Sequence, residues 1–258
     1  MVKMMPLSPS SLNLFAQCPF KYEGRYIKKI LKWDNNKEPF IYGRLIHEGL
    51  EQRLKRGPTF DLLAYFMQEA KKKNLLHCED KFNAVVANTS QFLSNIDRMM
   101  RDKWSVYVER EAVTDGEGGS CGWWDDTCFM RAKIDVLLVS PNGEEVIIVD
   151  WKTGKASSIN EFQLDFIALT LVPEFGLRRY SALDFLVDSG KVKKFEIEAD
   201  IASPKYISEK AYIQSKMCRT VQKIKGLMAA HTFNEFPATP SRLCRWCELD
   251  SCQYVGGN

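Results

Sequence analysis

Apolar side chains recur at helical spacing in the part of the chain that precedes Trp104. Residues three and four apart share one face of a helix, so these stripes predict amphipathic helices. A further helix is predicted to start within Ser8 to Ser11, because serine caps a first turn, and to end at the Cys18-Pro19 pair. The longer predicted helices are Phe40 to Leu54, Phe60 to Lys73 and Lys81 to Lys103.

From Trp104 onward the pattern changes to the alternation of apolar and polar residues that is typical of strands. Tight turns are predicted at Pro141-Asn142-Gly143 and at Ser189-Gly190, because these residue types suit the backbone of a turn. Each turn should join two strands into a hairpin. The predicted strands are Trp104 to Val113, Met130 to Val139, Glu145 to Trp151, Tyr180 to Val187 and Lys193 to Ala199.

Two more helices complete the order of elements. Ile159 to Leu171 follows the first hairpin, and the long amphipathic stretch Pro204 to Ala230 follows the second. This order predicts the α/β class, with a mixed central sheet flanked by helices. Without repeats or linkers, we expect one domain over residues 1–258: a helical part at 1–103, a sheet core at 104–200, and a helix with a cysteine group at 201–258.

Composition narrows the class of protein only slightly. No apolar run approaches the ~20 residues of a membrane span, and Met1 to Ser11 does not resemble a secretion signal. We therefore expect a cytoplasmic protein, in the host cytoplasm if it is viral, with no membrane partner. The formal net charge of +3 is too small to argue for nucleic acid by itself.

The chain has eight cysteines, and their spacing is informative. Cys244, Cys247 and Cys252 form a tight group, and stable disulfides are unusual in a reducing cytoplasm, so metal or cluster ligation is expected. A fourth ligand must come from elsewhere in the chain. Zinc and a [4Fe–4S] cluster suit thiolate ligands almost equally. Four other cysteines are scattered and are interpreted as packing or incidental residues: Cys78, Cys121, Cys128 and Cys218.

Two acids lie in segments that otherwise predict buried strands. Asp135 is flanked by Ile134 and Val136, and Asp150 follows four apolar residues. A buried carboxylate is costly unless it is paired, hydrogen-bonded or bound to a metal. Acids on adjacent hairpin strands can converge on one divalent cation, and their hard oxygen atoms suit Mg²⁺ or Mn²⁺.

Lys152 lies two residues after Asp150, on the same face of the predicted strand. Beside a bound phosphate, its ammonium would orient water or stabilise the charge of a pentavalent transition state. The alternative is an ordinary surface ion pair between Asp150 and Lys152. Gln163 could contact the scissile phosphate, and His47 could be a third metal ligand, although an isolated histidine on a helix is more often structural.

Several of these segments, taken in order, resemble the successive motifs of RecB-type PD-(D/E)XK nucleases. The resemblance covers nearly the whole chain, weakly between Thr59 and Lys103. With Cys18 and the C-terminal cysteines it narrows to the iron–sulfur branch, which includes CRISPR-associated RecB-like exonucleases, the AddB nuclease domain and related phage exonucleases. The matching segments are Ser8 to Pro19 with Tyr22, Gly43 to His47, Ile134-Asp135, Val149 to Lys155 and Gln163-Leu164.

The resemblance implies a restriction-endonuclease-like core and a role for each matching residue. The expected metal ligands are His47, Asp135 and Asp150, the catalytic lysine is Lys152, and Gln163 matches the glutamine of a QxxxY-type motif. A [4Fe–4S] cluster joining the two ends of the chain, with Zn²⁺ as the alternative, would be held by Cys18, Cys244, Cys247 and Cys252.

The sequence also departs from the family pattern. Ile167 occupies the position of the usual aromatic residue in the glutamine motif, and Trp151 replaces the common tyrosine between Asp150 and Lys152. Glu109 matches an auxiliary acidic position, but Glu111 would lie on the same strand face and the sequence does not separate them.

The resulting hypothesis is a divalent-metal-dependent deoxyribonuclease that acts as an exonuclease on the ends of single- or double-stranded DNA. Its protein partners would belong to recombination, CRISPR adaptation or phage replication; the oligomeric state stays open. The rival hypotheses are a catalytically silent DNA-binding or assembly subunit with the same fold, and a zinc-stabilised nucleic-acid-binding module.

Overall fold

A computed structural model of the chain describes residues 5–32, 36–117, 119–154, 161–175, 179–198 and 218–256. Its centre is a mixed sheet with the strand order β1-β2-β3-β4-β5. The strands are β1 (Ser105–Asp115), β2 (Cys128–Val139), β3 (Val146–Lys152), β4 (Arg179–Leu186) and β5 (Lys191–Glu198). The α/β prediction is therefore confirmed.

Pairing within the sheet follows the connections between its strands. β1, β2 and β3 pair antiparallel, and so do β4 and β5; tight turns join β2 to β3 and β4 to β5. β3 and β4 pair parallel, which requires a crossover. The helix α6 (Glu161–Phe175) lies between these two strands in the sequence.

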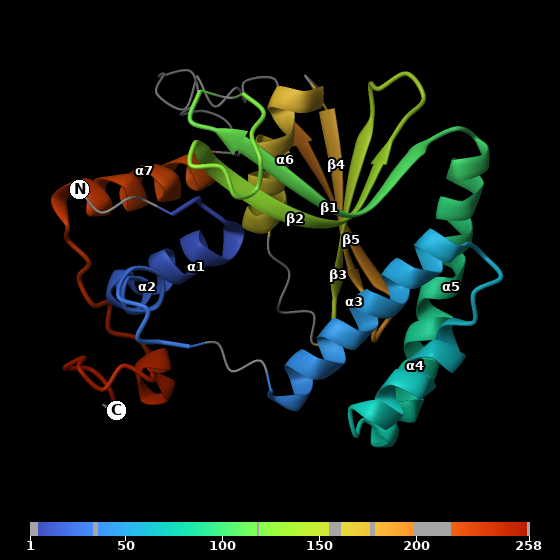
Figure 1. Cartoon of the computed structure of the whole chain (residues 1–258), viewed down its shortest axis with the longest axis horizontal. Helices are drawn as coiled ribbons and strands as arrows, with labels where there is room; N and C mark the ends of the chain where they lie inside the picture. Colours follow the sequence, from blue (N-terminus) through green and yellow to red (C-terminus); the bar gives the residue numbers. More distant parts are fainter. Residues whose placement is uncertain are drawn as a thin grey trace.

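Helices cover both faces of the sheet (Figure 1). On one face lie α3 (Glu38–Arg56), α4 (Leu62–Lys72) and α5 (Glu79–Arg101); on the other lie α1 (Pro9–Gln17), α6 and α7 (Cys218–Phe233). Each face has its own hydrophobic core. The α3-side core includes Leu50, Phe82 and Trp151, and the α6-side core includes Ile148 and Phe166.

The chain ends are built from short elements. Ser8 caps α1 through its side chain, which accepts a hydrogen bond from the Ser11 amide at 3.2 Å. α1 ends where Pro19 begins α2 (Pro19–Tyr22), which leads into the π-helical turn η1 (Glu23–Ile27). Near the other end, η6 (Arg242–Trp246) carries Cys244. Figure 1 shows the C-terminal segment beside α2.

The predicted elements differ from the structure mainly at their bounds. The helix predicted from Phe60 begins at Leu62, because Asp61 caps it by accepting a hydrogen bond from the Ala64 amide at 2.9 Å. Of the helix predicted at Pro204 to Ala230, the structure describes the part from Cys218, which continues to Phe233; residues 204–217 lie outside the described residues. Among the described helices, none has the length and apolar character needed to cross a membrane.

Candidate functional site

The candidate site is centred where β1 and β2 depart from regular strand geometry. In a regular strand, residues two apart share a face, yet Ile134 packs in the α6-side core and Val136 in the α3-side core. The side chains of β2 thus change face at Asp135, and we call this change the step. On β1, opposite the step, Glu109 adopts a positive φ of 53°. A non-glycine residue in this region costs about 1–3 kcal/mol and such strain is concentrated at functional sites.

Asp135 is held firmly at this step. Its Oδ2 atom accepts a hydrogen bond from the backbone amide of Trp151 at 2.7 Å, and its Oδ1 atom lies 3.2 Å from Nδ1 of His47 on α3. Burial, the largest single effect, lowers the pKa of His47, but the charge and hydrogen bond of Asp135 together with the charges of Asp150 and Glu109 raise it overall. The carboxylate thus links α3 to the backbone of β3.

Glu109 completes a group of potential metal ligands with His47 and Asp135. One ligand atom from each of the three residues lies within 4.8 Å of the others. They line an open cavity of about 620 Å³, together with Lys133, which forms an ion pair with Glu109. Glu111 is exposed, so the structure separates the two acids that the sequence leaves equivalent.

Asp150, Lys152 and Gln163 form a second group directly beside the first. Lys152 forms an ion pair with Asp150 and donates a hydrogen bond to Oε1 of Gln163 at 3.0 Å. The Gln163 amide donates to Oδ1 of Asp150 at 2.6 Å. Asp150 and Lys152 lie two residues apart on β3, so their side chains share one face of the strand and can pair.

Asp150 is buried close to two other carboxyl groups. Burial, followed by the negative charge of Asp135, raises its pKa to about 7, although Lys152 acts in the opposite direction. Asp184, fully buried and paired with Asp150 in the register of β3 and β4, adds to the repulsion. No local sequence pattern selects Asp184, since its position beside Asp150 depends on the parallel pairing of β3 and β4.

The donor set fits a divalent cation. Carboxylate oxygens and an imidazole nitrogen suit Mg²⁺ or Mn²⁺, and a cation would relieve the repulsion among Asp135, Asp150 and Glu109. The predicted residues His47, Asp135, Asp150, Lys152 and Gln163 all lie in this region. The group of three close ligands, however, contains Glu109 in the place predicted for Asp150.

The two departures from the family pattern have structural explanations. Ile167 is 1% exposed and packs in the α6-side core, so an aromatic side chain there would have to displace core residues. Trp151 points into the α3-side core, where its ring lies edge-on to Phe92 and Phe185 at 5.5 Å in both cases. Only its backbone amide contacts the site.

Cys18, Cys244, Cys247 and Cys252 line one small cavity of about 40 Å³ between the two chain ends. The amide of Thr239 donates to Sγ of Cys18 at 3.5 Å, and the amide of Ser241 donates to Sγ of Cys244 at 3.3 Å. A backbone hydrogen bond from Phe20 to Pro237 at 3.3 Å joins the same segments. The predicted set of cysteines is therefore brought together.

Comparison with known proteins agrees with this geometry. The model of the PD-(D/E)XK nuclease superfamily matches residues 6–252. The chain belongs to this superfamily, which indicates a nuclease of a kind that typically uses Mg²⁺ or Mn²⁺.

A search of curated proteins found no match. Among solved structures, one titled "Crystal structure of SSO0001" is 10% identical, with a TM-score of 0.30, covering 74% of this chain and 87% of that chain. This likeness is too low to support any argument about the site.

Proposed function

We propose that this protein is a divalent-metal-dependent deoxyribonuclease that hydrolyses phosphodiester bonds. The proposal is carried by one observation: His47, Glu109 and Asp135 converge directly beside the hydrogen-bonded group of Asp150, Lys152 and Gln163. The Trp151 amide, between Asp150 and Lys152 in the sequence, connects the two groups through Asp135.

Each side chain has a role that its position allows. His47, Asp135 and Glu109 would hold Mg²⁺ or Mn²⁺, and Asp150 would join them, because a bound cation would favour the ionised form that burial and the charge of Asp135 disfavour. When bound, such a cation neutralises phosphate charge and increases the acidity of water. Lys152 would donate to a phosphate oxygen and stabilise the charge that develops there, while Gln163 keeps the ammonium oriented.

The first test is cleavage of end-labelled single- and double-stranded DNA with Mg²⁺, Mn²⁺ or EDTA. We expect cleavage with either metal, none in EDTA, and recovery when metal is added in excess of EDTA. Bound but uncut DNA under all conditions would instead support the catalytically silent DNA-binding or assembly subunit.

A matched pair of variants tests the assignment of the auxiliary acid. Glu109→Gln should lower the rate at limiting metal by about 10-fold or more, because the carboxylate oxygen is a ligand. Glu111→Gln removes an exposed acid from the same strand and should leave the rate unchanged. Equal cleavage rates for the two variants would show that Glu109 is not a metal ligand.

We further propose exonuclease action on DNA ends and membership of the RecB-like iron–sulfur branch, with partners in recombination, CRISPR adaptation or phage replication. The order of the motifs and the convergence of the four cysteines support this. Four thiolates suit both a [4Fe–4S] cluster and Zn²⁺, and the resemblance to the iron–sulfur branch favours the cluster.

The colour of the purified protein tests whether an iron–sulfur cluster is bound. Protein purified without oxygen should be brown and absorb near ~400 nm, as thiolate-bound iron–sulfur centres do. Cys247→Ser should lose this absorbance and Cys121→Ser should keep it, because Cys121 lies outside the cysteine cavity. A colourless wild-type protein that contains zinc would favour the zinc-stabilised module.

A further inference from the structure

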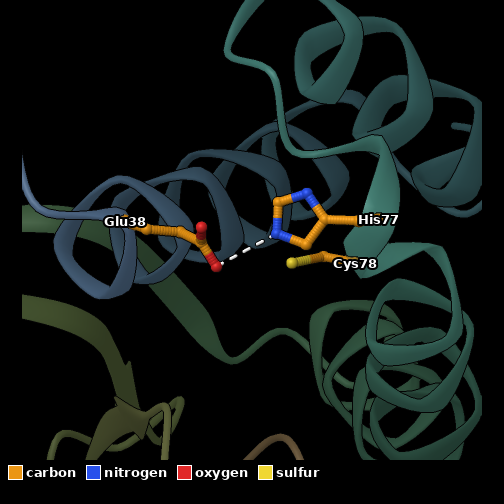
Figure 2. A group of neighbouring side chains, drawn as sticks. All are labelled: Glu38, His77 and Cys78. Carbon is orange, nitrogen blue, oxygen red and sulfur yellow. Dashed lines mark hydrogen bonds and ion pairs between the residues drawn. The ribbon is translucent and has the colours of Figure 1, made fainter.

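A second group of metal-ligating side chains lies at the start of α3, apart from the nuclease site. Glu38 is the first residue of α3, and His77 and Cys78 belong to the 3₁₀ turn η2 (Leu76–Cys78) between α4 and α5. One ligand atom from each lies within 4.8 Å of the others. Figure 2 shows the carboxylate, the imidazole and the sulfur facing one another.

The contacts within the group do not by themselves account for this arrangement. His77 Nε2 lies 3.1 Å from Oε1 of Glu38, but these side chains are 57% and 55% exposed. An exposed ion pair of this kind is worth about 0–1 kcal/mol. Cys78 is only 1% exposed, and its sulfur is directed at the pair rather than away from it.

The turn that presents two of the ligands is already ordered. The Cys78 amide donates to the Leu75 carbonyl at 2.9 Å, and Cys78 directly precedes α5. Its side chain packs in the α3-side core, whose members include Tyr42 and Phe82. A ligand pair on such a turn needs little further ordering on binding, which favours affinity.

We propose that Glu38, His77 and Cys78 form a binding site for a transition-metal ion, Zn²⁺ in particular. Thiolate, imidazole and carboxylate are the three ligand types that zinc accepts, whereas Mg²⁺ avoids sulfur. The charges of Zn²⁺, one thiolate and one carboxylate sum to zero, so the ion brings no net charge to the edge of the core. Binding releases the proton of the Cys78 thiol, and water fills the fourth position.

The ion would anchor the helix that carries His47. Glu38 precedes His47 by nine residues on α3, roughly 13 Å along the helix axis at 1.5 Å per residue. Between them, Tyr42 donates a hydrogen bond to Oδ1 of Asp188 at 2.7 Å, and the Gly154 amide donates to Oδ2 of Asp188 at 2.6 Å. A zinc ion held by Glu38, His77 and Cys78 would add a second link, from the start of α3 to the turn before α5.

Zinc binding to the full-length protein tests the proposal. Anaerobically purified protein is titrated with Zn²⁺, and the bound equivalents and affinity are compared for wild type, Cys78→Ser, His77→Gln and Glu38→Gln. Wild type should bind one equivalent more than Cys78→Ser, and His77→Gln should weaken this equivalent by at least ~100-fold, since loss of a direct ligand exceeds the effect of an outer-shell change. Cys121→Ser is the matched cysteine control and should bind as wild type does.

His77 and Glu38 are exposed, so their variants keep the test valid if Cys78→Ser folds poorly. A Co²⁺ difference spectrum of wild type minus His77→Gln should contain a thiolate-to-cobalt band. Identical stoichiometry and affinity in all variants would overturn the proposal. These readouts do not involve DNA, so a failure here is separate from a failure of the nuclease proposal.

Discussion

Replacement of Lys152 by alanine should reduce the rate of DNA cleavage by about 10²–10³-fold, or roughly 2.7–4 kcal/mol of transition-state stabilisation. The ammonium lies at the end of β3, paired with Asp150 and hydrogen-bonded to Gln163 at 3.0 Å. It is thus preorganised where charge would develop on the phosphate. Single-turnover cleavage of end-labelled DNA at saturating Mn²⁺ measures the effect on the chemical step.

The control for this variant is Lys191→Ala, which removes an exposed lysine from the start of β5. It should cleave DNA at the wild-type rate, which would show that the loss of one positive charge is not sufficient to slow cleavage. Circular dichroism should show that Lys152→Ala retains its secondary structure. A Lys152→Ala protein with more than a tenth of the wild-type rate would refute the catalytic assignment.

Replacement of Asp97 by alanine should lower the free energy of unfolding by about 3–5 kcal/mol, because it leaves a buried guanidinium without its counter-charge. Arg53 on α3 donates two hydrogen bonds to the carboxylate of Asp97 on α5, at 3.2 and 2.6 Å. Both residues are 8% exposed. Urea unfolding followed by circular dichroism gives the difference.

Two comparisons define what this ion pair contributes. The double variant Arg53→Met with Asp97→Leu removes both charges and should be far less destabilised than Asp97→Ala, as expected for a buried pair replaced by apolar groups. Lys55→Ala disrupts only the exposed pair with Glu51 and should cost less than ~0.5 kcal/mol. Equal losses for Asp97→Ala and Lys55→Ala would mean that the buried pair is screened by solvent.

The local pattern of apolar and polar residues predicts the helices and strands, but not the details of their backbone geometry. The apolar stripe of α5 and the alternation of β3 are properties of neighbouring residues, so the sequence predicts both. The positive φ of Glu109 occurs where β1 pairs with the step in β2. The sequence does not predict it, because the pairing of two strands cannot be read from either strand alone. For the same reason the sequence could not separate Glu109 from Glu111.

The site residues, too, can be predicted only where a local sequence pattern marks them. Asp135, Asp150 and Lys152 stand out because charged residues in apolar strands require an explanation, and the structure places them together with Gln163. The Glu38–His77–Cys78 group gave no such signal. Its members are separated by up to 40 positions, and each alone is an ordinary helix or turn residue. Only the packing of α3 against the turn before α5 makes them neighbours.

The position of Asp135 between two separate cores also bears on the order in which the chain is made. His47 comes from a helix of the α3-side core, whereas Gln163 comes from α6 on the opposite face. A chain emerging from the ribosome supplies His47 early, but α6 must follow before Gln163 can orient Lys152. A truncated or half-folded product that ends before α6 therefore lacks part of the candidate site, because Gln163 is missing from it.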